Sequence, residues 1–176
     1  MEVKLRSVVR LARRIMKGLM RSLRSARAMR QCGGYQSPIT VNGPTILTKN
    51  TYVGNNVHFN GFTVSGGGKV TIGDNFHSGP DCLLICQNHN FDHGKAVPYD
   101  NTYIYKDIEI GDNVWLGSRV IILGGVKIGE GAIIQAGSCV VSDIPAYAIA
   151  GGHPAKAFSS RNVEHYEKLK GEGKFH

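Results

Sequence analysis

A six-residue spacing of aliphatic side chains is the feature that most constrains the fold of this chain. From residue 110 to residue 140 every sixth position is bulky and aliphatic, and small or β-branched residues recur four positions later. The aliphatic positions are Ile110, Leu116, Ile122, Ile128, Ile134 and Val140. An α-helix repeats every 3.6 residues and a β-strand every 2.0 residues, so neither element explains this period.

A period of six predicts a left-handed parallel β-helix. In this fold each hexad forms one flat side of a triangular prism, three hexads make a coil, and the aliphatic residue points inward. The same phase recurs upstream at Val53 and Ile72, with a slip near Gly66. We therefore expect a mainly β domain over residues 52–158, with about five coils stacked at the inter-strand spacing.

The hexad phase breaks after Leu84. The separation from Leu84 to Ile104 is twenty residues, two more than three hexads. Residues 89–103 are therefore predicted to leave the prism as a polar and aromatic loop, with His89 at its root. Loops on a rigid scaffold often carry function, so His89 is a candidate general base or metal ligand, or else a polar residue of a turn.

The positive charge of the chain is concentrated in residues 1–31. This segment has ten basic side chains and one acidic side chain, which gives it a net charge of +9. Because the net charge of the whole chain is +8, the remaining residues carry a net charge of −1. On a helical wheel the basic side is Arg6, Arg10, Arg13, Lys17, Arg21 and Arg24, and the opposite side is Val8, Leu11, Ile15, Leu19, Leu23 and Ala26. The pattern predicts a basic amphipathic helical arm.

An anionic membrane surface is the partner that we expect for this arm. The arm could instead pack in an oligomer or act as a targeting presequence, and nucleic acid is not expected because no aromatic residues are interleaved with the basic ones.

Residues 32–51 read as a linker and lead-in to the prism. Residues 159–176 are expected to form a short helix with an N-capping serine, closing the end of the prism, followed by a tail.

The cysteines indicate reduced thiols. The paired spacings of a zinc site are absent from the four cysteines, which are Cys32, Cys82, Cys86 and Cys139. In the sequence, no apolar run approaches the roughly 20 residues needed to cross a bilayer. We expect a cytoplasmic protein without a bound metal, peripheral on the inner face of the membrane.

Three segments resemble the hexapeptide-repeat acyltransferases, especially the O-acetyltransferases of sugars and surface polysaccharides. They are IGDNFHSGPDCLLICQNHNF, IEIGDNVWLGSRVIILGGVKIGEGAIIQAGSCVV and DIPAYAIAGGHPAKAF, in the order and spacing of that family. The resemblance covers residues 50–158 and leaves out the arm. It implies an acetyl-CoA-dependent O-acetyltransferase that works as a homotrimer, with three active sites between neighbouring prisms and a sugar or glycan as acceptor.

The resemblance assigns the catalytic base to His89, ten residues beyond Gly79. A sugar hydroxyl is too weak an acid to attack a thioester at neutral pH unless a base such as a neutral imidazole removes its proton. Asn60 matches a polar residue that meets the acceptor or its oxyanion, and Asp81 matches a ligand of an acceptor hydroxyl. The backbone N–H of Ser118 matches an oxyanion-hole donor.

The resemblance also implies a path for coenzyme A. The matched positions are Trp115, Gly117 and Ser118 beside the thioester and pantetheine, Ala136 and Gly137 along the pantetheine arm, and Lys156 near the adenosine 3′-phosphate. Two positions depart from the family pattern, because Val141-Ser142 stands where a Thr-Lys pair is usual and His153 replaces an asparagine. We therefore expect coenzyme A to bind more weakly or in a slightly different way.

Other functions fit parts of the same pattern. An acetyltransferase of antibiotics or other small molecules, or a sugar N-acetyltransferase, would share the fold. A zinc-dependent carbonic anhydrase would need a metal held by histidines, for which His58, His77 and His89 are candidates, His58 and His77 being expected to stack one coil apart. A scaffold without enzymatic activity would need only the prism and the arms.

Overall fold

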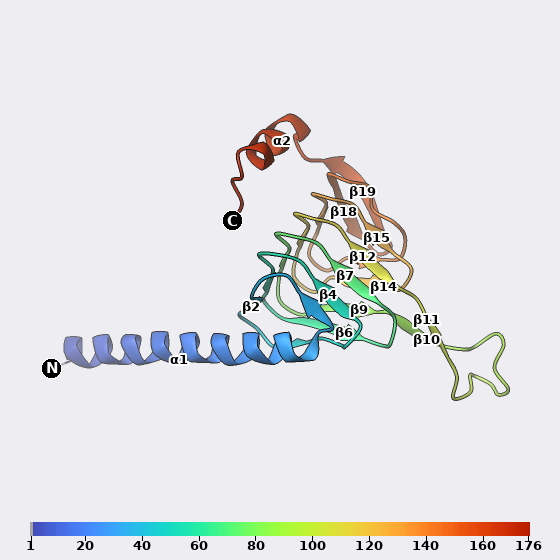
Figure 1. Cartoon of the computed structure of the whole chain (residues 1–176), viewed down its shortest axis with the longest axis horizontal. Coiled ribbons are helices and arrows are strands. Elements are labelled where there is room, and N and C mark those ends of the chain that lie inside the picture. Colours follow the sequence, from blue (N-terminus) through green and yellow to red (C-terminus); the bar gives the residue numbers. More distant parts are fainter. Residues whose placement is uncertain (1) are drawn as a thin grey trace.

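The computed structural model describes residues 2–176, and of residues 2–5, 7 and 8 only the backbone. The predicted place of Val8 on the apolar side of the arm therefore lies outside the described side chains. The chain forms a prism of stacked coils, with a long helix at its base and a hairpin and a short helix at its sides (Figure 1).

Three sheets form the faces of the prism. The first face contains β1 (Gly34–Tyr35), β4 (Thr51–Val53), β7 (Val70–Ile72), β12 (Ile108–Ile110) and β15 (Lys127–Ile128). The second face contains β2 (Thr40–Val41), β5 (His58–Phe59), β8 (His77–Ser78), β13 (Trp115–Leu116), β16 (Ile133–Ile134) and β18 (Ala148–Gly152), and β19 (Ala155–Ser160) is added to it antiparallel. The third face contains β3 (Thr45–Ile46), β6 (Phe62–Ser65), β9 (Cys82–Ile85), β14 (Ile121–Leu123) and β17 (Cys139–Val140).

The hexad prediction is confirmed, because each aliphatic residue of the series points into the prism. Leu116, Ile122 and Ile134 are fully buried, while their strand neighbours Trp115, Ile121 and Ile133 face outward. Strands of successive coils pair in parallel, so the stack is a left-handed β-helix of five complete coils and the beginning of a sixth. We call the turns between the first and second faces the first corner, those between the second and third the second corner, and those between the third and first the third corner.

The β-helix begins one coil earlier than the sequence prediction placed it. Strands β1, β2 and β3 form the first coil within residues 32–51, where the sequence predicts a linker and lead-in. The hexad phase does extend through Val41 and Leu47 to Val53, and all three side chains are buried. Gly33, Gly34 and Pro38, which are typical of a linker, conceal this phase in the sequence.

The last two turns of α1 (Glu2–Gln31) cover the open base of the prism. Ala28 is fully buried, Ser25 Oγ accepts a hydrogen bond from the Val41 N–H, and Gln31 Oε1 accepts one from the Leu47 N–H. These side chains satisfy backbone groups that the first coil would otherwise expose at its free edge. The preceding turns project beyond the prism (Figure 1), and among the described residues no helix is long and apolar enough to cross a membrane.

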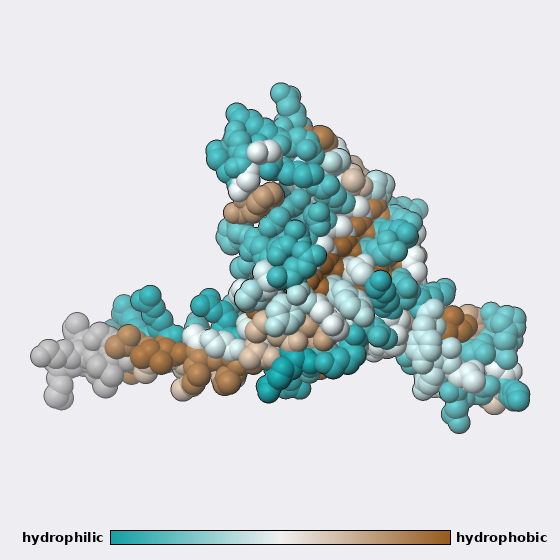
Figure 2. Space-filling model, in the orientation of Figure 1, coloured by the Kyte–Doolittle hydropathy of each residue, from teal (hydrophilic) through white to brown (hydrophobic). Residues whose placement is uncertain are grey.

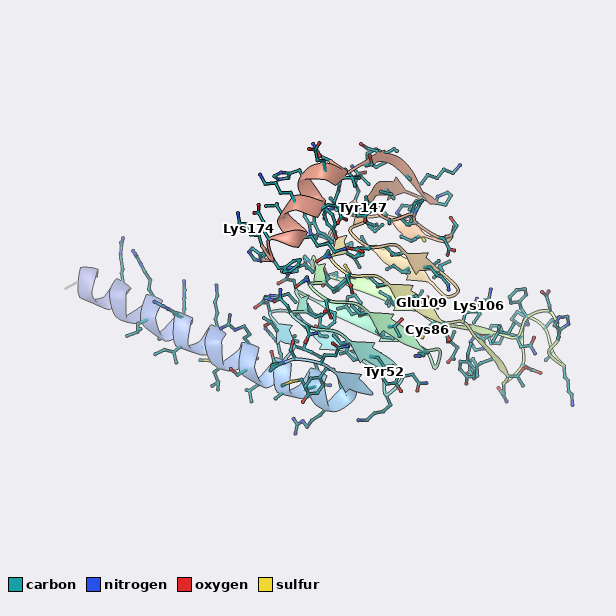
Figure 3. The ribbon with its side chains drawn as sticks, turned by 45° about the horizontal axis from the view of Figure 1, so that its top comes forward. Tyr52, Cys86, Lys106, Glu109, Tyr147 and Lys174 are labelled. Carbon is teal, nitrogen blue, oxygen red and sulfur yellow. The ribbon has the colours of Figure 1, made fainter. Side chains whose placement is uncertain are left out.

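The predicted loop is carried by a two-stranded antiparallel hairpin. Strands β10 (Gln87–His89) and β11 (Tyr103–Tyr105) pair in register, with His89 opposite Tyr103. The hairpin leaves the prism at the third corner, where the Lys106 N–H donates to the Cys86 carbonyl, and Figure 3 labels both residues at its base.

The C-terminal helix differs from the prediction in its cap and in its position. Helix α2 spans Val163–Gly171 and is capped by Asn162, because Ser159 and Ser160 belong to β19. It lies beside the first corner, where the Tyr166 hydroxyl accepts a hydrogen bond from Asn113 at 2.7 Å. The tail continues along the prism until Asn56 donates to the His176 carbonyl, so α2 and the tail flank the coils and do not close their end.

Candidate functional site

Six of the residues assigned by resemblance are stacked along the second corner. In successive coils this corner contains Asn60, then Asp81, then Gly117 and Ser118, then Ala136 and Gly137. The Arg119 N–H donates to the Pro80 carbonyl and the Gly137 N–H donates to the Ser118 carbonyl, both at 2.8 Å, which ties the coils together at this edge. The β-helix thus places residues that are up to 77 positions apart in the sequence, Asn60 and Gly137, on one edge of the prism.

Glycine permits the close stacking of this corner. A Cβ atom at Gly79 would lie 2.6 Å from the amide nitrogen of Ser118, a separation that real Cβ atoms essentially never show. At Gly137 the situation is the opposite, because φ is +72° and a Cβ there would meet no atom within 4 Å. Ala136 and Gly137 therefore border open space on the outside of the corner, where an extended ligand could lie against the backbone.

Asn60 and Asp81 both lie exposed on this corner, in different polar environments. The Asn60 amide donates to the Ser78 carbonyl at 2.6 Å and accepts from the Asn42 amide at 3.0 Å, so part of its hydrogen-bonding capacity serves the stack. Asp81 adopts a positive φ of 60° and its carboxylate lies 3.8 Å from the Arg119 guanidinium. Both partners of that ion pair are largely exposed, so it contributes at most about 1 kcal/mol.

Ser118 presents its backbone to the same edge. Its amide nitrogen faces Gly79 of the preceding coil, and within the described part of the chain this N–H has no hydrogen-bond acceptor. A half-buried N–H that lacks an internal acceptor is a suitable donor to an oxyanion.

Trp115 lies on the second face, next to the second corner. Its strand β13 pairs in register with His77 and Ile133, and its side chain is 53% exposed. Together with α2 and the tail, this face borders a cavity of about 870 Å³ whose lining includes Trp115, His77 and Phe175. The outer face of β13 is therefore accessible to a ligand from one side.

Lys156 and His153 lie at the last coil. Lys156 is exposed on β19, opposite Gly151 in the terminal hairpin. The His153 ring contacts the Gly137 carbonyl, and the Gly152 N–H donates to Ser138 Oγ. The histidine that departs from the family pattern thus borders the top of the second corner.

His89 is not brought together with these residues within one protomer. It lies on the hairpin at the third corner, and the third face separates that corner from the second. The two parts of the predicted site therefore occupy opposite edges of the same face.

The surroundings of His89 include two tyrosines that sequence reasoning missed. The His89 ring stacks on Tyr99 with a centroid separation of 3.7 Å, and Tyr103 lies at 4.9 Å. A small cavity of about 270 Å³ beside the ring is lined by Ser65, Gln87 and Tyr103, among others. The pairing of His89 with Tyr103 follows from hairpin register, whereas no sequence signal marks Tyr99.

The predicted stacking of His58 on His77 is present on the second face. Their ring centroids are 4.5 Å apart and nearly parallel, and His176 of the tail contacts His77 edge-on at 5.3 Å. Burial lowers the pKa of both side chains, assisted at His58 by His176 and Arg21 and at His77 by the other two histidines. His89 lies at another corner, and among the described residues no cluster of three His, Cys, Asp or Glu is arranged to hold a metal ion.

Comparison with known proteins gives consistent matches. A family model described as bacterial transferase hexapeptide (six repeats) matches residues 100–142. Galactoside O-acetyltransferase of Escherichia coli is 37% identical over 115 residues, covering 64% of this chain and 55% of that protein. A solved galactoside acetyltransferase in complex with coenzyme A superposes with a TM-score of 0.61 at 31% identity, covering 76% of this chain and 68% of that one.

A second solved structure, a hexapeptide-repeat acetyltransferase from Vibrio cholerae, gives a TM-score of 0.64 at 27% identity and covers 80% of both chains. The chain therefore belongs to the hexapeptide-repeat acyltransferase family. It spans about half the length of the curated relatives that it matches.

The lowered pKa values of His58 and His77 predict a loss of stability in mildly acid solution. Below the ordinary value of about 6.5 the unfolded chain binds protons that the native protein does not bind, so the free energy of unfolding falls as the pH drops toward the native pKa values. We expect the thermal midpoint to fall further between about pH 7.5 and about pH 5.5 for the wild type than for the double variant His58→Asn with His77→Asn.

The matched control is His93→Asn, since His93 is exposed in the hairpin loop. This variant should keep the pH dependence of the wild type. Equal losses for the wild type and the double variant would show that the stacked pair does not contribute.

Proposed function

We propose that this protein is an acetyl-CoA-dependent O-acetyltransferase acting on a sugar hydroxyl, with its active site assembled between two copies of the chain. The observation that carries the proposal is the division of the candidate residues between two edges of one face. His89 lies at the third corner and the Ser118 stack lies at the second. A complete site then requires the third corner of one copy and the second corner of the next.

The outer surface of the third face supports a homotrimer. Its outward side chains are mostly apolar, although they face away from the core of the prism. They are Ile46, Thr63, Ser65, Leu83, Ile85, Ile121, Leu123, Cys139 and Val141. Three copies that bury this face around a common axis would bring the third corner of each prism beside the second corner of its neighbour, in a closed head-to-tail ring.

In such a site His89 acts as the general base. It takes the proton of the acceptor hydroxyl as that oxygen attacks the thioester carbonyl, and the Ser118 N–H stabilises the negative charge on the carbonyl oxygen. The carbon–sulfur bond then breaks, an ester forms, and the proton passes to the sulfur of coenzyme A. Each of these contributions is strongest in the transition state, which is where catalysis requires it.

The second corner fits coenzyme A. The open space beside Ala136 and Gly137 allows the pantetheine arm to lie along the stack, with Trp115 and Gly117 near the thioester end. Lys156 offers a positive charge at the last coil for a phosphate, and His153 is a further polar group there. The solved relative in complex with coenzyme A supports this choice of cosubstrate.

Asn60 and Asp81 are the residues that we propose for the acceptor. Asn60 retains one amide N–H beyond the bond to Ser78, and Asp81 offers an exposed carboxylate that can accept from sugar hydroxyls. The name of the E. coli relative supports a sugar acceptor. We propose a sugar unit of a surface glycan or of its lipid-linked precursor, because the arm favours a substrate that is held at a membrane.

The projecting part of α1 supports binding to an anionic membrane on the cytoplasmic side. Its basic side chains are exposed from Arg6 to Arg21, and Arg24 donates to the Asn42 carbonyl of the prism at 2.7 Å. Its apolar side chains are also exposed, namely Leu11, Ile15, Leu19 and Leu23. Figure 2 shows hydrophilic groups along the upper side of this helix, the side of the prism, and apolar groups along the lower side.

This arrangement suits an interfacial helix that lies flat with its apolar side buried among headgroups. Each basic residue near an anionic surface contributes about 1 kcal/mol, and three arms of one trimer would bind with avidity. Within one copy of the chain, α1 packs on the prism through its last turns, where Ala28 is buried.

Substitution of His89 tests the proposed chemistry. His89→Ala should reduce the rate of thiol release from acetyl-CoA, measured with a panel of galactosides, maltose and amino sugars, by about 10²- to 10⁴-fold. His93→Ala on the same hairpin should retain the wild-type rate, and both variants should elute as trimers. Full activity of His89→Ala would refute the base, and acetylation of amines alone would refute the O-acetyltransferase.

Truncation of α1 tests the membrane proposal. Removal of residues 2–20 leaves the turns that cover the first coil, so the truncated protein should fold and acetylate soluble sugars. It should no longer sediment with vesicles that contain phosphatidylglycerol, whereas the full chain should sediment with these and not with pure phosphatidylcholine.

Gln substitutions at Arg10, Arg13, Lys17 and Arg21 should weaken vesicle binding in the full chain, and added salt should weaken it for the wild type. Sedimentation of the truncated protein would contradict the anchor. Binding to duplex DNA without binding to vesicles would also contradict it.

A further inference from the structure

The His89 ring is held between aromatic side chains of its own hairpin. Its plane lies 15° from that of Tyr99, with the centroids 3.7 Å apart, which is a stacked arrangement. Tyr103 contacts the ring from β11 at 4.9 Å in a tilted arrangement. Aromatic pairs of this kind contribute about 0.5–1.5 kcal/mol beyond the area that they bury.

No hydrogen bond from the described residues to Nδ1 fixes this imidazole. In catalytic histidines the nitrogen that is not reacting is usually held by a carbonyl or a carboxylate, which sets the ring orientation. His89 Nδ1 is buried and has no hydrogen-bond partner among the described residues of the chain. The orientation of the ring in the protomer therefore depends on packing, and Tyr99 provides its closest aromatic contact.

The loop places Tyr99 through its neighbour Asp100. The Asp100 carboxylate accepts from the Lys95 N–H, from the Thr102 N–H and from the Thr102 hydroxyl, and these bonds lower the pKa of Asp100. The Asn90 side chain adds a second brace, because its amide donates to the Thr102 hydroxyl. Both sides of the loop are thus tied together directly beside Tyr99.

We propose that Tyr99 is a positioning residue, which holds the His89 imidazole by stacking in place of a hydrogen bond to Nδ1. The buried Nδ1 leaves Nε2 as the nitrogen that meets the acceptor hydroxyl. This inference rests on the proposed role of His89 as the base. On this proposal the aromatic face of Tyr99 holds the imidazole in place, and the phenol hydroxyl of Tyr99 is not required.

Removal of the ring should affect the chemical step more than substrate binding. A base that is displaced by about 1 Å can lose about 100-fold in rate, so Tyr99→Ala should lower kcat on the order of 10- to 100-fold. Its KM for acetyl-CoA should stay within about two-fold of wild type, because coenzyme A is bound at the second corner of the other copy. Tyr99→Phe keeps the stacking surface and should restore kcat to the wild-type range.

Phe91→Ala is the matched control, since Phe91 is a 60% exposed aromatic residue of the same loop. It should retain kcat. If Tyr99→Phe were as impaired as Tyr99→Ala, the hydroxyl would be the required group and stacking would be excluded. Wild-type kcat in Tyr99→Ala would also overturn the proposal.

Carbethoxylation of histidine by diethyl pyrocarbonate tests the stacking of Tyr99 on His89 independently of activity. We call this stacking contact the clamp. His89 and His93 fall in one short stretch of the chain, so mass spectrometry can compare their rates in the same sample, with exposed His93 as the internal reference. The rate of His89 relative to His93 should rise several-fold in Tyr99→Ala and remain at the wild-type value in Tyr99→Phe.

An unchanged ratio in Tyr99→Ala would show that Tyr99 does not cover the ring, which overturns the clamp even in an active enzyme. A raised ratio in a protein that transfers no acetyl group would support the clamp and refute the proposed function. Failure of the Tyr99 proposal and failure of the proposed function would therefore give different results.

Discussion

The parallel stacking of coils at the second corner is the constraint on which the other features depend. Each coil is hydrogen-bonded to the next through backbone groups, as between Ser118 and Gly137, and the inward aliphatic residues fill the prism at every sixth position. The corner can stack this closely only because Gly79 leaves room for the amide of Ser118. The same packing that stabilises the fold therefore places the Ser118 N–H and the open space beside Gly137 along one outer edge.

A rigid prism also separates groups that must meet. The hairpin that carries His89 and the edge that carries Ser118 are fixed on either side of the third face. The apolar outer surface of this face provides a physical reason for association, and association would bring the two edges together in pairs. Oligomerisation and catalysis would then share one cause, the burial of the third face.

Much of this architecture could be predicted from hexad phase alone. The phase placed Leu116 and Ile122 in the core and located the hairpin by its interruption after Leu84. The first coil escaped prediction although Val41 and Leu47 keep the phase, because Gly33, Gly34 and Pro38 are residues typical of a linker. Phase carries no information on contacts made by loops and termini. The stacking of Tyr99 on His89, the capping of the base by Ser25 and the course of the tail along the first corner depend on tertiary packing.

The central claim is that His89 of one copy works with the second corner of another. Subunit mixing tests it with two variants, His89→Ala and Ala136→Trp, the second of which blocks the exposed corner. Each should be inactive alone. Random mixed trimers should recover about a quarter of wild-type activity, because each mixed trimer contains one site with both halves intact. Absence of recovery in mixed trimers confirmed by mass would contradict the account, since both halves of each site would then come from one chain.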